Sequence, residues 1–365
     1  MTTPQPNAEI TEKWGRPLVA LVCDTCDWNY LVASLPSRMQ CPHCFTGTLE
    51  TFELDVDKFP TIAPPEEILP FRVSKPDIPK LLPRFVEDIP FPSLDLNPIT
   101  FNQRARKVYL PIWLVDGTVK AQWQVEVGYP YQVESYESRY SNGQWQSRQV
   151  KETRTEWEKR VGQLRRAYDN VTAPALDEHN TLVQYLGTFN EVPIRAYTPD
   201  SIDGVFVRLP NRSPEDALPY AQEGFRERAE VDIKDATEAS SLRGFQWQAG
   251  YQNLHWTKRL IPVVMSYYLD DDKQARMVLI NAVTGHIAGE KRASMRRARR
   301  FTFIGFAIAA LIASVAISII LADPTLDDVA ALLALVASGV GFGALIPAFR
   351  VWRFNDAQEK WGTYS

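Results

Sequence analysis

The chain has 365 residues and a formal net charge of −4 at pH 7, with 45% hydrophobic and 23% charged residues. This length suffices for two soluble units and a membrane anchor. Residues 1–289 hold 31 basic and 38 acidic side chains, and such an acidic part is poorly suited to nonspecific binding of nucleic acid. The polar residues 1–13 lack the apolar core of a secretory signal, so we expect this part of the chain in the cytosol.

Four cysteines near the start form two CxxC pairs. Cys23 and Cys26 are separated from Cys41 and Cys44 by 14 residues, which is short enough for a β-hairpin. Each CxxC turn directs two thiolates at one ion, and two such turns close a tetrahedral site with no open position. The spacing therefore predicts a zinc ribbon over residues 1–58, with one structural Zn²⁺ bound by all four cysteines. A redox dithiol would need a βαβ setting, which the sequence lacks.

The residues around the cysteines favour a structural or protein-binding role. Residues 14–58 hold three basic and six acidic side chains, and this net charge of −3 disfavours contact with phosphates. His43 lies inside the second cysteine pair. Because a closed Cys₄ site needs no further ligand, we expect His43 in an exposed loop rather than on the metal.

A proline-rich strap is predicted over residues 59–100. It contains ten prolines between residues 60 and 98. Proline lacks an N–H and restricts φ, so we expect an extended strap, partly in the polyproline II conformation. Apolar residues such as Ile68, Leu82 and Phe85 interrupt it, and we expect them to pin the strap onto the rest of the protein.

The body, residues 101–290, has the pattern of an α+β fold with antiparallel strands. Asp116-Gly117 and Asn142-Gly143 are hairpin turn signals, and each lies between two strand-like runs. Further strands are expected over residues 245–256, 260–269 and 275–282.

Two local signals in the body point to a helix and to a tight turn. Ser213, Pro214 and the following acids predict a helix from there to about Ala236. Asn281 to Gly285 predicts a tight turn.

The last part of the chain has the pattern of a transmembrane helical hairpin over residues 301–350. Residues 301–322 and 329–349 are uncharged runs of 22 and 21 residues, and about 20 apolar residues span a bilayer core. A basic collar over residues 291–300 precedes them and residues 323–328 connect them with three aspartates. Because excess Lys and Arg stay in the cytosol, we expect both termini there, including the tail 351–365.

Small residues in the two runs allow close packing of helices. Ser314 and Ser318 in the first run, and Gly339 and Gly343 in the second, are spaced four apart. We expect these faces to pack within the hairpin. Contact between copies in a homo-oligomer is the alternative.

No catalytic pattern stands out in the soluble part. It has no nucleotide-binding loop, dinucleotide fingerprint, HExxH or GxSxG motif. The acids Asp270, Asp271 and Asp272 are more typical of a solvated turn than of a cation site. The tryptophans are expected in the core and in cross-strand pairs. We therefore expect a protein that is not an enzyme.

Four features occur together in this chain: the two cysteine pairs, the strand from Tyr109 to Trp113, the turn at Asn281 to Gly285 and the C-terminal hairpin. In this combination the chain resembles a bacterial protein family. Its members are membrane-anchored proteins with a cytosolic zinc ribbon, often catalogued by the ribbon's similarity to that of primosomal replication-restart helicases. That similarity covers only about Cys23 to Cys44, and the chain has no helicase motor motif. The resemblance implies partners among stomatin/flotillin-like or phage-shock-type membrane proteins.

These observations predict a membrane-tethered adaptor in the bacterial cytoplasmic membrane that recruits other membrane-associated proteins. Its ligands would be the lipid bilayer, one Zn²⁺ and a protein partner, and nucleic acid is not expected. Two alternatives stay open: a membrane tether for DNA or a replication complex, and an enzyme with a site that the sequence does not reveal.

Overall fold

The computed structural model describes residues 8–36, 38–53, 62–141, 144–189 and 193–362. The chain divides into two compact units. Unit 1 comprises residues 1–111, 178–209 and 260–365, and unit 2 comprises residues 112–177 and 210–259. The fold is of the mixed α+β kind, as the sequence predicts.

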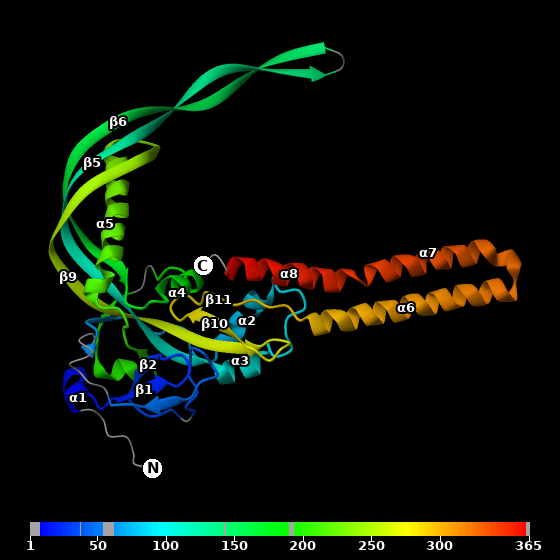
Figure 1. The fold of residues 1–365 in the computed structure, drawn as a ribbon, viewed down its shortest axis with the longest axis horizontal. Coiled ribbons are helices and arrows are strands. Elements are labelled where there is room, and N and C mark those ends of the chain that lie inside the picture. The colour runs from blue at the N-terminus through cyan, green and yellow to red at the C-terminus, as the bar shows by residue number, and fades with distance from the viewer. Residues whose placement is uncertain (1–7, 37, 54–61, 142–143, 190–192, 363–365) are drawn as a thin grey trace. The chain divides into compact units, whose positions relative to one another are not determined.

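The elements follow one another along the chain, and Figure 1 labels most of them. The strands are β1 Val19–Cys23, β2 Asn29–Val32, β3 Leu49–Thr51, β4 Glu67–Ile68, β5 Arg106–Ser141, β6 Gln144–Pro174, β7 Arg195–Ala196, β8 Phe206–Arg208, β9 Ser241–Leu269, β10 Ala275–Asn281 and β11 Ile287–Gly289. The helices are α1 Ala8–Trp14, α2 Ile78–Val86, α3 Pro98–Arg104, α4 His179–Leu186, α5 Pro214–Ala236, α6 Met295–Ala322, α7 Asp327–Gly343 and α8 Ile346–Gly362, with short 3₁₀ turns at Pro199–Ile202 and Pro324–Leu326.

The strands that carry the cysteines belong to the main sheet of unit 1. The order in this sheet is β11-β10-β9-β5-β8-β2-β1-β3. β1 pairs antiparallel with β2 and β3, and β2 pairs with β8 through Tyr30 and Arg208. The strands next to the cysteines therefore continue the sheet.

Two strands are longer than the sequence predicts. β5 runs without a turn through Asp116-Gly117, where the structure has a β-bulge instead of the predicted hairpin. A Cβ on Gly117 would lie 2.6 Å from Leu254, and the Asp116 carboxylate accepts the N–H of Asn170 on β6. Packing on one side and pairing on the other thus keep the strand continuous through a local turn signal. β9 likewise joins the two strands predicted over residues 245–256 and 260–269.

The second predicted hairpin is present. β5 and β6 pair antiparallel up to Ser141 and Gln144. The expected turn residues Asn142 and Gly143 lie outside the described residues. The predicted turn after β10 is also confirmed: the Asn281 side chain accepts the N–H groups of Val283 and Thr284.

Helix α5 packs on the β5–β6 face of unit 2, as its sequence pattern requires. It begins after the predicted cap Ser213, whose hydroxyl accepts the N–H of Asp216, and ends at Ala236. The face it buries is spaced three and four residues apart, as one side of a helix must be. The buried residues of this face are Ala217, Ala221, Phe225, Ala229 and Ile233.

The strap is folded more than the sequence predicts. The apolar residues Ile68, Leu82 and Phe85 are buried, as expected. Residues 78–86, however, form helix α2, which corrects the expectation of an extended chain. Pro79 lies in the first turn, where its missing N–H costs nothing, and Ile78, Leu82 and Phe85 share one helix face.

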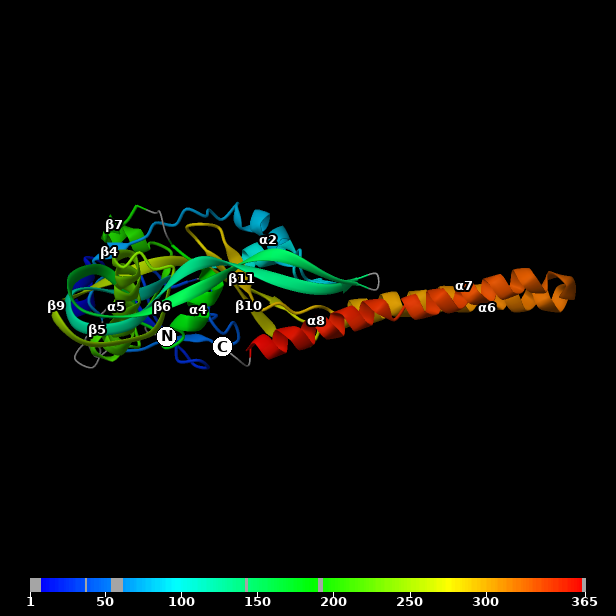
Figure 2. The same ribbon diagram turned by 90° about the horizontal axis from the view of Figure 1, so that it is seen from above.

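The last three helices contain two helical segments that are long and apolar enough to cross a membrane, and the second of these runs from α7 into α8. These segments are Met295–Ala322 and Asp327–Lys360. Figures 1 and 2 show α6 and α7 side by side. The helical path is interrupted between α7 and α8 at residues 344–345, just before Pro347, which cannot donate a helical N–H.

The small residues that pack inside this pair differ from those predicted. A Cβ on Gly305 would lie 2.6 Å from the Cβ of Ala344. Gly339 and Gly343 have no neighbour within 4 Å of their Cβ positions among the described residues. Ser314 and Ser318 bond to carbonyls of their own helix. The prediction of packing through these four residues is therefore wrong, because they lie on other faces of the helices.

Hydrogen bonds fasten the start of α6 to the sheet and to α8. Asp271 accepts the Ser294 hydroxyl at 2.7 Å and the N–H of Arg296 at 2.8 Å. The Asn355 amide of α8 accepts the N–H of Ala293 and donates to its carbonyl. Residues 293–296, just before and at the start of α6, are thus fixed by hydrogen bonds to Asp271 on one side and to Asn355 of α8 on the other.

Candidate metal centre

The four cysteines converge at one end of the strands β1 and β2. Cys23 ends β1, Cys26 lies in the turn before β2, and Cys41 and Cys44 lie before β3. Their Sγ atoms all lie within 4.8 Å of one another, and none is in a disulfide. Two of the sulfur pairs are Cys23 with Cys44 at 3.6 Å and Cys26 with Cys41 at 3.7 Å. This is a metal-binding arrangement, compatible with a single structural ion.

The two cysteine turns have the same backbone design. In each, an N–H two residues after the first cysteine points at that cysteine's sulfur: Thr25 to Cys23 and His43 to Cys41, both at 3.4 Å. The residue after the second cysteine is left-handed in both turns, with φ of 57° at Asp27 and 61° at Phe45. Backbone donors around sulfur favour the thiolate form, which is the form that binds metal.

The thiols differ in their acidity because they share protons. A hydrogen bond from Cys26 lowers the pKa of Cys41 to about 5, and the same bond raises the pKa of Cys26. Burial raises the pKa of Cys23. Cys41 is therefore more acidic than Cys26 and Cys23, and a bound cation would favour the thiolate form of the sulfurs that hold it.

Aromatic side chains cover the base of the cysteine cluster. Tyr30 is fully buried with its hydroxyl 3.7 Å from the sulfur of Cys41, and burial raises the pKa of this phenol. His43 stacks on Trp28 with ring centroids 3.7 Å apart. His43 is therefore half-buried, which corrects the prediction of an exposed loop residue. The described group of converging ligand atoms consists of the four cysteine sulfurs and does not include His43.

A buried arginine also lies beside the cluster. Arg208 on β8 is 3% exposed, donates to the carbonyl of Asn29 and lies over the Trp28 ring at 4.8 Å. Burial lowers its pKa, whereas the negative charges of Glu178, Cys26 and Cys41 oppose that shift. Glu178 accepts the indole N–H of Trp28 on the same side. The guanidinium thus supplies positive charge close to the thiolates.

Sequence reasoning missed Arg208 and Tyr30. Arg208 follows the sulfur ligands by more than 160 positions, and only strand pairing brings it there. One local signal exists: the arginine interrupts an apolar run between Val207 and Leu209, as expected for a buried charge with a dedicated partner.

The other predicted candidates are structural in the described residues. The three acids do not form one solvated turn, because Asp270 is buried and paired with Arg276 at 2.7 Å, and Asp271 caps α6. Trp113 and Trp256 form an edge-to-face pair in the core of unit 2, as expected for core tryptophans. Trp145 is 73% exposed but forms a cross-strand pair of the predicted kind with Tyr140, with ring centroids 5.3 Å apart.

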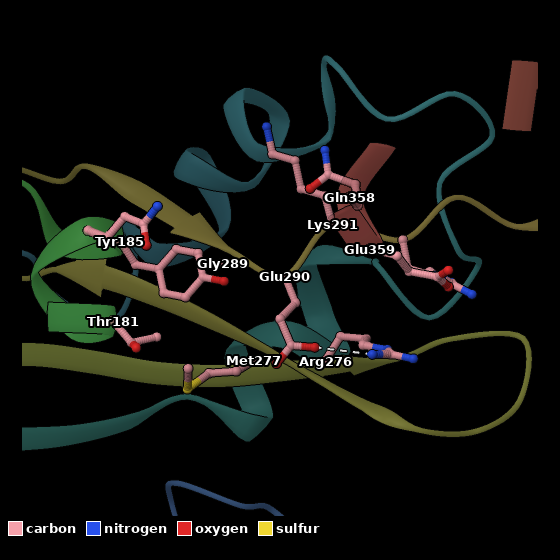
Figure 3. Close-up of a pocket in the computed structure, with 11 residues that line it drawn as sticks. Thr181, Tyr185, Arg276, Met277, Gly289, Glu290, Lys291, Gln358 and Glu359 are labelled. Carbon is pink, nitrogen blue, oxygen red and sulfur yellow. Dashed lines mark hydrogen bonds and ion pairs between the residues drawn. The ribbon is translucent and has the colours of Figure 1, made fainter. Parts of the chain in front are cut away.

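A cavity of about 610 Å³ in unit 1 lies between α4, the β10–β11 hairpin and the end of α8. Figure 3 shows Tyr185 and the ion pair of Arg276 with Glu290 facing it. Its basic groups are all engaged, since Arg292 pairs with Glu359 and Lys291 with Asp88. Its lining residues are Thr181, Gln184, Tyr185, Arg276, Met277, Gly289, Glu290, Lys291, Arg292, Gln358 and Glu359. We therefore interpret the cavity as a gap between elements that ion pairs hold together, and not as a ligand site.

Comparison with known proteins leaves the cysteine cluster as the principal guide to function. No protein-family model, curated protein or solved structure matches the chain.

Proposed function

We propose that the protein is a membrane-anchored zinc-ribbon scaffold that recruits another membrane-associated protein. The observation that carries this proposal is the convergence of four cysteine sulfurs in the same unit as two apolar helices. The function is one of binding, because a centre with four protein thiolates has no position left for a substrate.

The donor set and its spacing fit zinc. Four thiolates at about 2.3 Å from a tetrahedral Zn²⁺ lie roughly 3.8 Å apart. Two of the sulfur pairs, at 3.6 and 3.7 Å, lie near this spacing. The three short strands β1, β2 and β3 around the cluster support a zinc ribbon. When bound, the ion supplies a structural cross-link and no reaction chemistry.

The anchor is a two-pass helical hairpin in a bacterial cytoplasmic membrane. Our assignment of both ends to the cytosol is supported by the positive-inside rule, because basic residues flank the hairpin on both sides: arginines 296, 297, 299 and 300 at the start of α6, and Arg350 and Arg353 in α8. The aspartates of residues 323–328 then face outward. A cytosolic compartment also keeps the four cysteines reduced and available for metal.

The partner is a protein, and the acidic edge of the cysteine module is where we place its contact. Glu50 on the edge strand β3 and Glu53 just after it are exposed. Exposed acids repel phosphates, so this surface opposes the alternative of a DNA tether. The resemblance of the sequence to the membrane-anchored family implies partners of the stomatin/flotillin-like or phage-shock type, and these are the first candidates.

The test compares a surface variant with a metal variant in the full-length chain. Glu50→Lys/Glu53→Lys should keep the metal but abolish co-purification of the partner from native membranes. Cys23→Ser/Cys26→Ser should lose both. A matched control, Glu238→Lys, changes an exposed acid of unit 2 and should retain the partner. Salt-sensitive binding of DNA by the wild-type protein at physiological ionic strength would instead favour the DNA tether.

Topology is tested by labelling single introduced cysteines in intact cells. Thr325→Cys, in the connection between α6 and α7, should react with a membrane-impermeant thiol reagent. Asp272→Cys, on an exposed turn of unit 1, should react only after the cells are broken. The opposite pattern would reverse the compartment assignment and remove the reducing environment on which the zinc proposal relies.

A further inference from the structure

The end of the β5–β6 hairpin is a ribbon of only two strands. The third strand, β9, begins at Ser241, next to Ser240, whose N–H donates to the carbonyl of Gly128 on β5. Beyond this point residues 129–141 of β5 pair with residues 144–156 of β6 alone, and we call this part the distal ribbon. Figure 1 shows it continuing past the ends of β9 and α5. A two-stranded ribbon is marginally stable in water, so a further strand would stabilise it.

The free edge of β6 is the better template for such a strand. In the part of the chain that is described, β6 pairs with no strand except β5. Its residues 145–173 contain no proline, whereas the free edge of β5 carries Pro130, which has no N–H to donate. A long unpaired edge without proline presents a row of backbone donors and acceptors to another chain.

We propose that β6 of a second copy of this chain pairs antiparallel with β6, about a two-fold axis at Thr153. The sequence of β6 is self-complementary about this position. Trp145 and Val161, which are 73% and 77% exposed, are the two exposed large hydrophobic side chains of β6 among the described residues. They lie eight positions before and eight after Thr153, so each would be covered by the other from the second copy. Aromatic and β-branched residues make favourable cross-strand pairs.

The charges of β6 are complementary about the same axis. Arg148 would oppose Glu158, and Glu152 would oppose Arg154, so that each pair occurs twice by symmetry. No pair of like charges results anywhere between residues 144 and 162. An axis at Glu152 would oppose that acid to its own copy, and an axis at Arg154 would do the same for a base. The pairing register is therefore specified by charge as well as by the apolar pair.

Cross-linking of the full-length protein in membranes tests this register. In antiparallel pairs opposite Cα atoms lie about 4.5–5.5 Å apart, within the range that a disulfide bridges. Thr153→Cys should therefore form a disulfide-linked dimer under mild oxidation. Thr155→Cys is the matched control, because Thr155 is also exposed but its two copies would lie roughly 13 Å apart along the strands. Equal cross-linking of the two variants, or none of Thr153→Cys, would overturn the proposal.

A charge exchange gives a second, independent test. Arg154→Glu places acid opposite acid twice across the axis and should lower the dimer fraction several-fold in light scattering of the detergent-solubilised chain. Glu152→Arg/Arg154→Glu restores opposite charges across the axis and also keeps the ion pair of these two residues within one strand. It should recover the dimer. A double variant that dimerises no better than the single one would reject the interface, and so would a monomeric wild-type protein.

Discussion

The cysteine module, residues 18–53, and the distal ribbon are both small pieces of β-structure, and they differ in what stabilises them. The strands of the module have five, four and three residues, yet Trp28 and Tyr30 are buried beneath its cysteines. The strands of the ribbon are longer, but Tyr136, Tyr140 and Trp145 at its end are exposed. Strand length thus matters less than what covers the strands. The sheet of unit 1 covers the module, and in our proposals a metal ion cross-links it and a second copy covers the ribbon.

Removing one ligand should break the module and give the largest effect. Cys26→Ser removes one of four thiolates, and structural zinc contributes on the order of 10 kcal/mol to the folding of such modules. We expect hydrogen–deuterium exchange to accelerate throughout β1 and β2 and to stay unchanged in unit 2. Normal protection of β1 in this variant would show that the sheet alone holds the module.

The ion pair of Asp270 with Arg276 tests whether a buried ion pair stabilises like a metal cross-link. Asp270→Asn leaves Arg276 without its closest carboxylate, so the free energy of unfolding should fall by roughly 1–3 kcal/mol. Burial acts to raise the pKa of Asp270, but the N–H groups of Gln274 and Asp272 and the Arg276 side chain lower it overall.

Because this pKa is lowered in the folded state, the stabilisation is complete above the usual carboxyl pKa of about 4 and is lost as the pH falls through the folded value. Thermal unfolding of wild type and Asp270→Asn should therefore differ at pH 7 and converge well below pH 4. A difference that stays constant with pH would show that the carboxylate charge is not responsible.

Arg208 should contribute to the metal centre through charge, with a smaller effect. Arg208→Met keeps the volume of the side chain and removes the positive charge beside Cys26 and Cys41. Mutation of a group beside the metal ligands typically lowers metal affinity 10- to 100-fold. Arg208→Met should therefore lose zinc to a competing chelator about tenfold faster than the wild-type protein. Arg208→Lys keeps the charge and should recover part of the difference. Identical release from all three proteins would limit Arg208 to packing.

The smallest effect is expected from shortening the ribbon. Residues 131–154 can be replaced by Asn-Gly, which forms a two-residue hairpin turn between Pro130 and Thr155. The buried residues of unit 2 lie elsewhere, so its stability should change by no more than about 0.5 kcal/mol. The dimer should be lost. A large loss of stability would mean that the ribbon supports the core of unit 2 directly.

The sequence predicts best those features that short-range chemistry decides. The cysteine spacing identifies all four converging residues, since two fixed turns suffice to bring them together. Ser213 and Pro214 locate the start of α5, because capping depends on the neighbouring N–H groups. The two apolar helices follow from composition and length.

Features that depend on distant packing escaped prediction. Asp116-Gly117 is a turn signal in isolation, but pairing with β6 and contact with Leu254 turn it into a bulge. Arg208 reaches the cysteines only through the pairing of β8 with β2. In both cases the deciding contact comes from a residue more than 50 positions away, which no local pattern encodes.

The central claim, a closed structural zinc site, is tested most directly by the metal content of the full-length protein. Protein extracted from membranes under reducing conditions should hold about one zinc per chain by elemental analysis, as one Cys₄ site requires. The Cys23→Ser/Cys26→Ser variant, purified in the same way, should hold almost none. Equal zinc in the two proteins, iron with the absorbance of an iron–sulfur cluster, or a disulfide among the four cysteines would contradict the account.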